Sequence, residues 1–300
     1  MSSEHGVKAI YYALLANFGI AVAKGIATFF TMSGSMLAET IHSLADCINQ
    51  MLLLFGLKSS KRAPDSSHPL GYGKDIYFWS FVVALMLFSI GGLFSIYEGI
   101  HKLHSDEPIQ KVWIALTVLG VSIVLELLSL LGAIKEIKML KKDKPFFTWF
   151  KQTRNSELIV VLGEDTAAVL GLVIAFIFVY LSNALNMPVL DAVGSIAIGV
   201  ILLCISFFLI FRMKALLIGK SANPEIQAQI EKAIAKGSGV EKVLNILTIQ
   251  NGPYVMLAAK IKMDKNINIE EACKNINIIE EDLKNRFPTL EWSFIEPDIK

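Results

Sequence analysis

Four polar side chains recur at helical spacing within the apolar stretch 35–57. Glu39, His42, Asp46 and Asn49 are separated by three, four and three residues, so they share one face of a helix. A charged group at the centre of a membrane helix costs roughly 2.5–3.5 kcal/mol, and such a face is expected to line a bundle interior or a watery cavity. An imidazole and a carboxylate one turn apart can also hold a divalent cation. The pattern therefore indicates a cation transport site, and the alternative is a stripe that only hydrogen-bonds neighbouring helices.

A second apolar stretch supplies matching acids. Asp165 lies near the middle of RNSELIVVLGEDTAAVLGLVIAF, with Glu164 beside it and Glu157 two turns earlier. Val161 lies between these carboxylates on the same face. Because buried charges are costly in a membrane span, we expect Asp165 to bind the cation, and Glu164 is a further candidate.

Other ionisable residues have two interpretations each. Glu126, in the middle of the stretch 111–137, could carry protons or support the cation site, and Lys24 could equally pair with it structurally. His68, near Asp65, could bind a metal weakly, although the turn residues around it could shape that connection without a metal. Asp191 is expected at a helix start and not as a ligand.

The composition is that of a membrane protein. Of the 300 residues, 54% are hydrophobic and only 18% are charged, and each of six apolar stretches reaches the roughly 20 residues that a bilayer core requires. The three cysteines lie far apart, so neither a disulfide framework nor a thiolate zinc site is indicated. We predict six transmembrane helices at about 7–31, 36–58, 76–100, 111–137, 157–183 and 188–212.

The lysines and arginines predict the orientation. They gather before the first stretch, in the second and fourth connections and after the sixth stretch, whereas the first and fifth connections have none. By the positive-inside rule both termini lie on the cytoplasmic side, and a plasma (inner) membrane location is expected.

The last part of the chain has the pattern of a small soluble domain. Asn223-Pro224-Glu225 predicts a helix start, with a helix to about Lys236. Two strands, a helix and a last strand follow at 243–250, 254–263, 269–286 and 290–295, with Asn251-Gly252-Pro253 as a turn. We predict a transmembrane domain at 1–216 and an α+β domain of order α-β-β-α-β at 217–300.

Several motifs together resemble the cation diffusion facilitator family of divalent-metal/proton antiporters. They are GSMLAETIHSLADCINQ, HPLGYGK, the acid of the fifth span, PVLDAVGSIAIG and the terminal WSFIEPD, and they extend over nearly the whole chain. Within that family, HSLADCINQ and GEDTAAVLGLV look closest to the branch that contains zinc transporter 9.

The resemblance implies a metal site of two residues from the second helix and two from the fifth. His42 and Asp46 match the first pair, and Asp165 matches the last position. The remaining position, commonly histidine, is Val161 here, so Glu164, Asn49 or water must complete the site, or the metal is not zinc.

The resemblance also implies a homodimer with a ferredoxin-like cytoplasmic domain that often binds zinc. This domain has no histidine and only one cysteine, Cys273. Carboxylates such as Asp264, Glu296 and Asp298 suit hard cations better, so we expect poor zinc binding there.

These observations predict a homodimeric transporter that moves a divalent cation, Zn²⁺ in the first place, in exchange for protons. His42, Asp46, Asp165 and Glu164 are the expected metal ligands. A carrier of Mn²⁺, Fe²⁺ or Co²⁺ is the alternative within transport, and a transport-inactive membrane scaffold or regulatory protein is the alternative outside it. We expect no enzyme activity, because no nucleophile–base set or cofactor loop is present, and no nucleic-acid partner.

Overall fold

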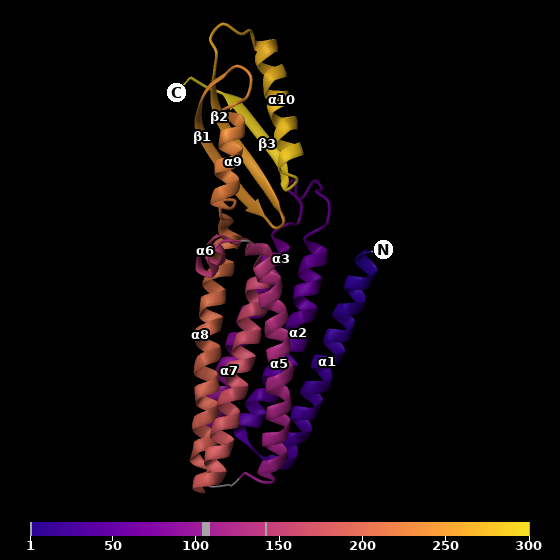
Figure 1. The fold of residues 1–300 in the computed structure, drawn as a ribbon, viewed down its shortest axis with the longest axis vertical. Helices are drawn as coiled ribbons and strands as arrows, with labels where there is room; N and C mark the ends of the chain where they lie inside the picture. The colour runs from indigo at the N-terminus through magenta and orange to yellow at the C-terminus, as the bar shows by residue number, and fades with distance from the viewer. Residues whose placement is uncertain (1, 104–108, 142, 300) are drawn as a thin grey trace. The chain divides into compact units, whose positions relative to one another are not determined.

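A computed structural model describes residues 2–103, 109–141 and 143–299, and it is mainly helical (Figure 1). Its described residues include six long helical segments that coincide with the predicted apolar stretches. They are α1 (Ser2–Thr31), α2 (Gly34–Ser59), the continuous α3 (Asp75–Met86), η1 (Leu87–Leu93) and α4 (Phe94–Lys102), then α5 (Val112–Lys141), α7 (Ser156–Leu185) and α8 (Val189–Gly219).

Four of the described helices are long and apolar enough to cross a membrane. They begin at Asp75, Val112, Ser156 and Val189. The predicted class, a mainly α membrane protein with a small α+β domain, is thereby confirmed. That α1 and α2 also cross the membrane stays a prediction.

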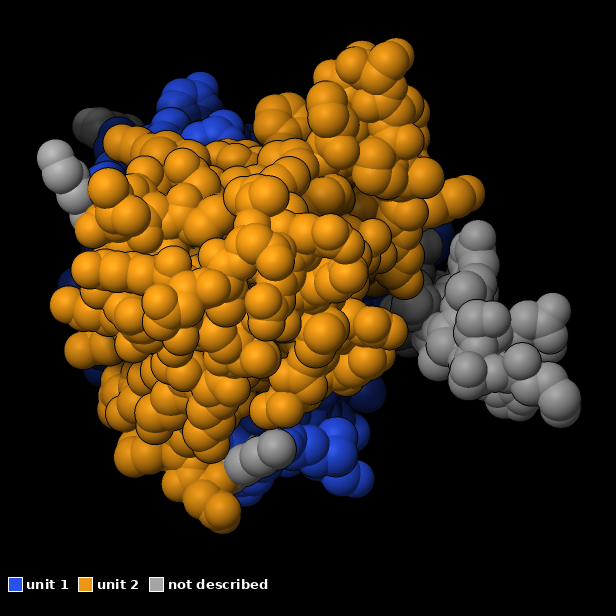
Figure 2. All heavy atoms as spheres, turned by 90° about the horizontal axis from the view of Figure 1, so that it is seen from above, with its two compact units in different colours: residues 1–56, 79–142, 156–213 blue, residues 57–78, 143–155, 214–300 orange. Residues whose placement is uncertain are grey.

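The chain forms two compact units, which Figure 2 colours separately. The first consists of 1–56, 79–142 and 156–213, and the second of 57–78, 143–155 and 214–300. The second unit thus joins the C-terminal domain to the α2–α3 connection and to the segment between α5 and α7. That segment contains a short helix, α6 (Phe146–Gln152), that the sequence patterns did not predict. The predicted boundary between 216 and 217 stays a prediction.

Glycines allow close helix packing in the first unit. A Cβ atom on Gly199 of α8 would lie 2.7 Å from the carbonyl oxygen of Gly92, and one on Gly99 of α4 would lie 2.6 Å from Ile196. Small residues of this kind let membrane helices approach backbone to backbone. Gly92 belongs to η1, a wider π-helical turn that interrupts the helix between α3 and α4.

Asp191, near the start of α8, caps the N-terminus of α2. Its carboxylate accepts hydrogen bonds from the Ser33 hydroxyl at 2.8 Å, the Gly34 amide at 2.6 Å and the Ser35 amide at 3.2 Å. The two amides have no partner within a helix, and a helix N-terminus favours a negative charge. The expectation that Asp191 lies at a helix start is correct, but its main hydrogen bonds are to a different helix.

The C-terminal domain has the predicted order. It consists of α9 (Pro224–Ile234), β1 (Val240–Asn251), β2 (Tyr254–Met263), α10 (Ile269–Arg286) and β3 (Leu290–Pro297). β2 is central, antiparallel to β1 and parallel to β3. The Asn223 side chain caps α9 by accepting from the Glu225 amide at 3.0 Å.

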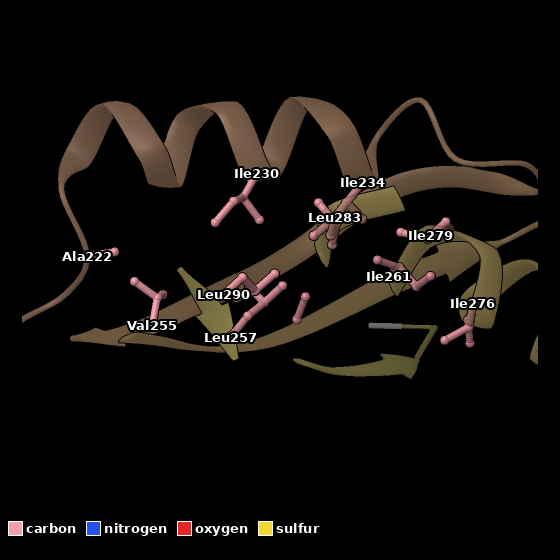
Figure 3. Close-up of a cluster of buried hydrophobic side chains, with 11 residues drawn as sticks. Ala222, Ile230, Ile234, Val255, Leu257, Ile261, Ile276, Ile279, Leu283 and Leu290 are labelled. Carbon is pink, nitrogen blue, oxygen red and sulfur yellow. The ribbon is translucent and has the colours of Figure 1, made fainter. Parts of the chain in front are cut away.

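The core of this domain follows from strand alternation. Every second residue of β2, from Val255 to Ile261, is buried. These side chains pack with Ile230 and Ile234 of α9 and with apolar residues of α10 (Figure 3). Both helices therefore cover one face of the sheet.

The turn between β1 and β2 docks into the α2–α3 connection, within the second unit. The Tyr77 hydroxyl donates to the Gly252 carbonyl oxygen at 3.0 Å, and the Asn251 side chain donates to the Leu70 carbonyl oxygen at 2.6 Å. A Cβ atom on Gly73 would overlap the Asn251 backbone. Gly252 has a φ of 61°, which suits a two-residue hairpin turn. The HPLGYGK motif therefore forms the surface against which this turn packs.

Candidate functional site

Four carboxylates line one small cavity in the first unit. Asp46 comes from α2, Glu126 from α5, and Glu164 and Asp165 from α7. The cavity volume is about 20 Å³, which is enough for one water molecule. Because these acids carry charge of the same sign in a confined space, a cation or protons would be stabilised among them.

Neutral partners orient two of these acids. The Asn49 side chain donates a hydrogen bond of 2.6 Å to Glu164, and the Ser129 hydroxyl donates one of 3.1 Å to Asp165. The Oδ1 atoms of Asp46 and Asn49 are buried without a hydrogen-bond partner among the described residues. Unpartnered buried oxygens are costly, and they are available as ligands.

His42 lies beside the cavity but does not line it. Its Nε2 is 3.7 Å from the Asp46 carboxylate, and both ring nitrogens are buried without a hydrogen bond to any described residue. A Cβ atom on Gly91 of η1 would lie 3.9 Å from its Nδ1.

The structure brings together part of the predicted ligand set. Asp46, Glu164 and Asp165 line the cavity together, whereas His42 lies next to Asp46 and does not line it. Within the described residues, no three His, Cys, Asp or Glu side chains form a group that could hold a metal as they stand. Val161, one turn before Asp165, is half-buried and does not line the cavity. The four-residue ligand set stays a prediction.

Sequence patterns named Glu126 as a possible support of the cation site, but they did not identify Asn17, Ser43 and Gln50, which also line the cavity. Gln50 lies four residues after Asp46, so helical spacing could have found it. Asn17 of α1 and Glu126 of α5 enter the cavity from other helices, and nothing local pairs them with α2.

Lys24 pairs with Glu39 and not with Glu126. Its ammonium donates to the Glu39 carboxylate at 3.2 Å and to the Ser43 hydroxyl at 2.7 Å, and both charged side chains are fully buried. This corrects the ion pair between Lys24 and Glu126 that was considered from the sequence. Glu126 lines the cavity instead.

The connection around His68 is organised by Asp65. The Asp65 carboxylate accepts from the Ser67 hydroxyl at 2.6 Å, the Tyr72 hydroxyl at 2.7 Å and the His68 amide at 2.8 Å. These hydrogen bonds, first those of the Ser67 and Tyr72 hydroxyls, hold the pKa of Asp65 well below its usual range. The His68 ring is half exposed, 3.7 Å from Asp65. This geometry favours a shaped turn over a metal site.

Carboxylates of the C-terminal domain already have partners. Lys260 lies 2.7 Å from Asp298 and 3.9 Å from Glu296. The hydrogen bond from Lys260 to Asp298, together with both negative charges, raises the pKa of Lys260. Asp264 accepts from the backbone and the side chain of Asn266. The expectation of poor zinc binding stays a prediction, and these contacts support it.

Comparison with known proteins bears directly on this geometry. Residues 10–218 match the model of the cation efflux transmembrane domain, and 222–298 match that of the cation efflux protein cytoplasmic domain. The chain is 31% identical over 255 residues to metal tolerance protein C4 of Arabidopsis thaliana, covering 84% of this chain and 56% of that protein.

Two further relatives carry metal-specific names. The mitochondrial proton-coupled zinc antiporter SLC30A9 of Xenopus laevis is 34% identical over 247 residues, covering 81% of this chain and 44% of that protein. The manganese efflux system protein MneP of Bacillus subtilis is 25% identical over 302 residues, covering 95% of this chain and 93% of that protein. The chain thus spans about half the length of the first two relatives.

Among solved structures, the C-terminal domain of MamM (residues 215–293) is 16% identical. The match covers 25% of this chain and 96% of the MamM domain. Its TM-score of 0.25 is too low to support an argument about the fold. The family models do not depend on that likeness, because together they match both parts of the chain. The protein therefore belongs to the cation efflux family, also called the cation diffusion facilitators, near the branch that contains SLC30A9.

Proposed function

We propose that this protein is a homodimeric secondary transporter that moves Zn²⁺ across a membrane in exchange for protons. The observation that carries this proposal is the cavity lined by Asp46, Glu126, Glu164 and Asp165, with His42 beside it. Asp46, Glu164 and Asp165 supply oxygen ligands, and His42 supplies a nitrogen ligand after a small movement toward Asp46.

Proton exchange follows from the chemistry of these ligands. Carboxyl and imidazole groups must lose their protons before they bind a metal, so metal entry releases protons and metal exit takes them up. Glu126 is the candidate to carry a proton, because it lines the cavity from α5 and is not one of the expected ligands. Alternating access would come from helices that rock around this fixed site.

Manganese is the second candidate substrate. The cavity is lined by carboxylates, and oxygen ligands suit Mn²⁺ better than they suit Zn²⁺. The name of MneP, a manganese efflux protein, is consistent with that option, whereas the name of SLC30A9, a zinc antiporter, favours zinc.

The membrane and the assembly are part of the proposal. The lysine distribution favours cytoplasmic termini and a plasma membrane location, although the SLC30A9 relatives are named as mitochondrial. Dimer formation is supported by the match to the cation efflux cytoplasmic domain model at 222–298.

Initial metal flux in proteoliposomes tests the proposal. Wild type, Asp165→Asn and Glu164→Gln are compared at equal protein density with Zn²⁺, Mn²⁺, Fe²⁺ and Co²⁺, while internal pH is recorded. Two unit charges 4 Å apart attract by about 4 kcal/mol at an effective dielectric constant of 20, so removal of the Asp165 charge should lower flux below detection. Glu164→Gln should act as strongly if Glu164 is a ligand and less strongly if a water completes the shell.

The matched control is Glu136→Gln, which makes the same change on an exposed α5 carboxylate that does not line the cavity. It should keep wild-type flux. Wild-type flux from Asp165→Asn for every metal would mean that the site is misplaced. No metal flux from the wild type would favour the scaffold alternative, and flux without proton movement would exclude the exchange mechanism.

A further inference from the structure

A second cavity, of about 240 Å³, lies wholly within the second unit. One wall is formed by residues 60–64 and 70–73 of the α2–α3 connection. The other is formed by Tyr254 of β2 and by Glu291 and Trp292 of β3. The metal cavity is formed by different helices of the first unit, so this second cavity has no role in the proposed transport site.

The connection wall is cationic. Lys61 and Arg62 both line it, and the Arg62 guanidinium lies 3.9 Å from the centre of the Tyr72 ring. In the described part of the chain, neither cation is in an ion pair with a carboxylate. The Tyr72 hydroxyl donates a hydrogen bond to Asp65, which fixes the ring. The Arg62 guanidinium therefore makes its cation–π contact with a ring that is held in place. Such a guanidinium is suited to bind a phosphate.

The strand wall has the opposite character. Glu291 supplies a carboxylate that forms no ion pair with another described residue. Next to it, the rings of Tyr254 and Trp292 meet edge to face with centroids 6.2 Å apart. A carboxylate beside aromatic rings attracts an ammonium group by charge and by cation–π interaction.

Chain connectivity places one wall of the cavity next to the first residues of a candidate membrane span. Ser60 directly follows α2, and Gly73 precedes by two residues the helix beginning at Asp75, which is long and apolar enough to cross a membrane. The Ser59 hydroxyl donates to the Asp75 carboxylate, so the ends of α2 and α3 are held together. One wall of the cavity therefore lies within two residues of a candidate membrane span, which is where lipid headgroups would be within reach.

We propose that this cavity binds a zwitterion in which a phosphate and an ammonium group are joined by a short linker. Lys61 and Arg62 receive the phosphate, and Glu291 with the two aromatic rings receives the ammonium. The headgroup of phosphatidylethanolamine has this chemistry, and so does free O-phosphoethanolamine. An anionic headgroup without an ammonium, such as that of phosphatidylglycerol, would leave Glu291 unpaired next to a negative ligand.

Native mass spectrometry of the delipidated full-length protein tests the proposal. Phosphatidylethanolamine and phosphatidylglycerol of different acyl mass are added in equal amounts, and the bound lipid is counted. We expect the wild type to retain phosphatidylethanolamine over phosphatidylglycerol by roughly tenfold, the effect of losing about one charge-assisted hydrogen bond. Arg62→Gln should lower the retention of both lipids, because both carry the phosphate, whereas Glu291→Gln should abolish the preference. Lys265→Gln and Glu281→Gln are matched controls on exposed residues outside the cavity and should keep it.

A titration with O-phosphoethanolamine distinguishes the two sources. Displacement of the bound lipid at equal concentration would identify the soluble headgroup as sufficient, and failure to displace it would assign the site to the lipid. Equal binding of both lipids by the wild type would overturn the proposal without reference to any variant. An unchanged preference in Glu291→Gln, or unchanged retention of both lipids in Arg62→Gln, would overturn it as well. Because metal flux is not measured, these results are independent of the transport proposal.

Discussion

The carboxylates that line the cavity of the first unit are the groups that we expect to set what it binds. Asp46, Glu126, Glu164 and Asp165 converge from three helices on a cavity the size of one water molecule. Asn49 and Ser129 each satisfy one oxygen of an acid in this set, and the Asp46 Oδ1 atom is left without a partner among the described residues. Among the described residues, His42 is the one imidazole beside these acids, so we expect the balance of oxygen and nitrogen ligands to set metal preference.

Val161→His should shift the preference toward zinc. The substitution places an imidazole one turn before Asp165 on the same helix face, and imidazole favours Zn²⁺ over Mn²⁺. We expect the ratio of zinc flux to manganese flux to rise several-fold in proteoliposomes. Val161→Leu, which keeps the position apolar, is the control and should leave the ratio unchanged. A ratio unaffected by the histidine would show that position 161 does not reach the transported ion.

At the scale of elements, α2 depends on contacts at both of its ends. Asp191 of α8 receives the first amide groups of α2, and Lys102 of α4 lies 3.8 Å from the same carboxylate. At the other end, Ser59 bonds to Asp75 of α3. His42 and Asp46 lie between these two attachments, so their positions follow from the placement of both helix ends.

Asp191→Asn should destabilise the protein. The substitution removes the negative charge at the N-terminus of α2. It also turns one acceptor oxygen into a side-chain NH₂ group, which would face the Gly34 or Ser35 backbone amide donor to donor. A lost cap of this kind costs about 0.5–2 kcal/mol, so the midpoint of thermal unfolding in detergent should fall by a few degrees. Asp282→Asn makes the same change at an exposed ion pair on α10 and should have almost no effect. An equal midpoint for both variants would contradict the cap.

Gly73→Ala should release the β1–β2 turn from the α2–α3 connection. The added methyl group would overlap the backbone carbonyl of Asn251, which cannot move aside as a flexible side chain could. Hydrogen exchange at the amides of Gln250, Asn251, Gly252 and Tyr254 should become faster by at least an order of magnitude, because these groups would open locally. Gly132→Ala is the control, since its Cβ would meet nothing within 4 Å. Unchanged exchange in Gly73→Ala would mean that the contact adds no protection to this turn.

At the scale of the whole molecule, the charge distribution predicts that the α7–α8 turn and the C-terminal domain lie on opposite sides of the membrane. Single cysteines at Asn183 and Ser221, both exposed, test this in a chain from which Cys47, Cys204 and Cys273 have been removed. A membrane-impermeant maleimide added to intact cells should label only Asn183→Cys. Ser221→Cys should react only after the membrane is permeabilised. Labelling of both from one side would disprove the six-span topology.

Local sequence patterns determined the elements. Runs of apolar residues predicted the long helices, and the pattern of 254–263 predicted the strand β2. The caps at Asn223 and Asn268 and the turn at Gly252 mark where the C-terminal elements begin and end. These signals are readable because they depend on backbone preferences and on the spacing of neighbours along one helix or strand.

The contacts between helices were decided only by the tertiary structure. Asp191 caps a helix whose first residue, Gly34, lies 157 positions away in the chain, and Lys24 bonds to Glu39 although Glu126 was an equally plausible partner. Glu126 reaches the cavity because of how α5 packs against α1 and α7. Helical period fixes which residues share a face of one helix, but it does not fix the rotation and axial shift of that helix against its neighbours. Side-chain packing sets those two quantities, and with them the membership of the site.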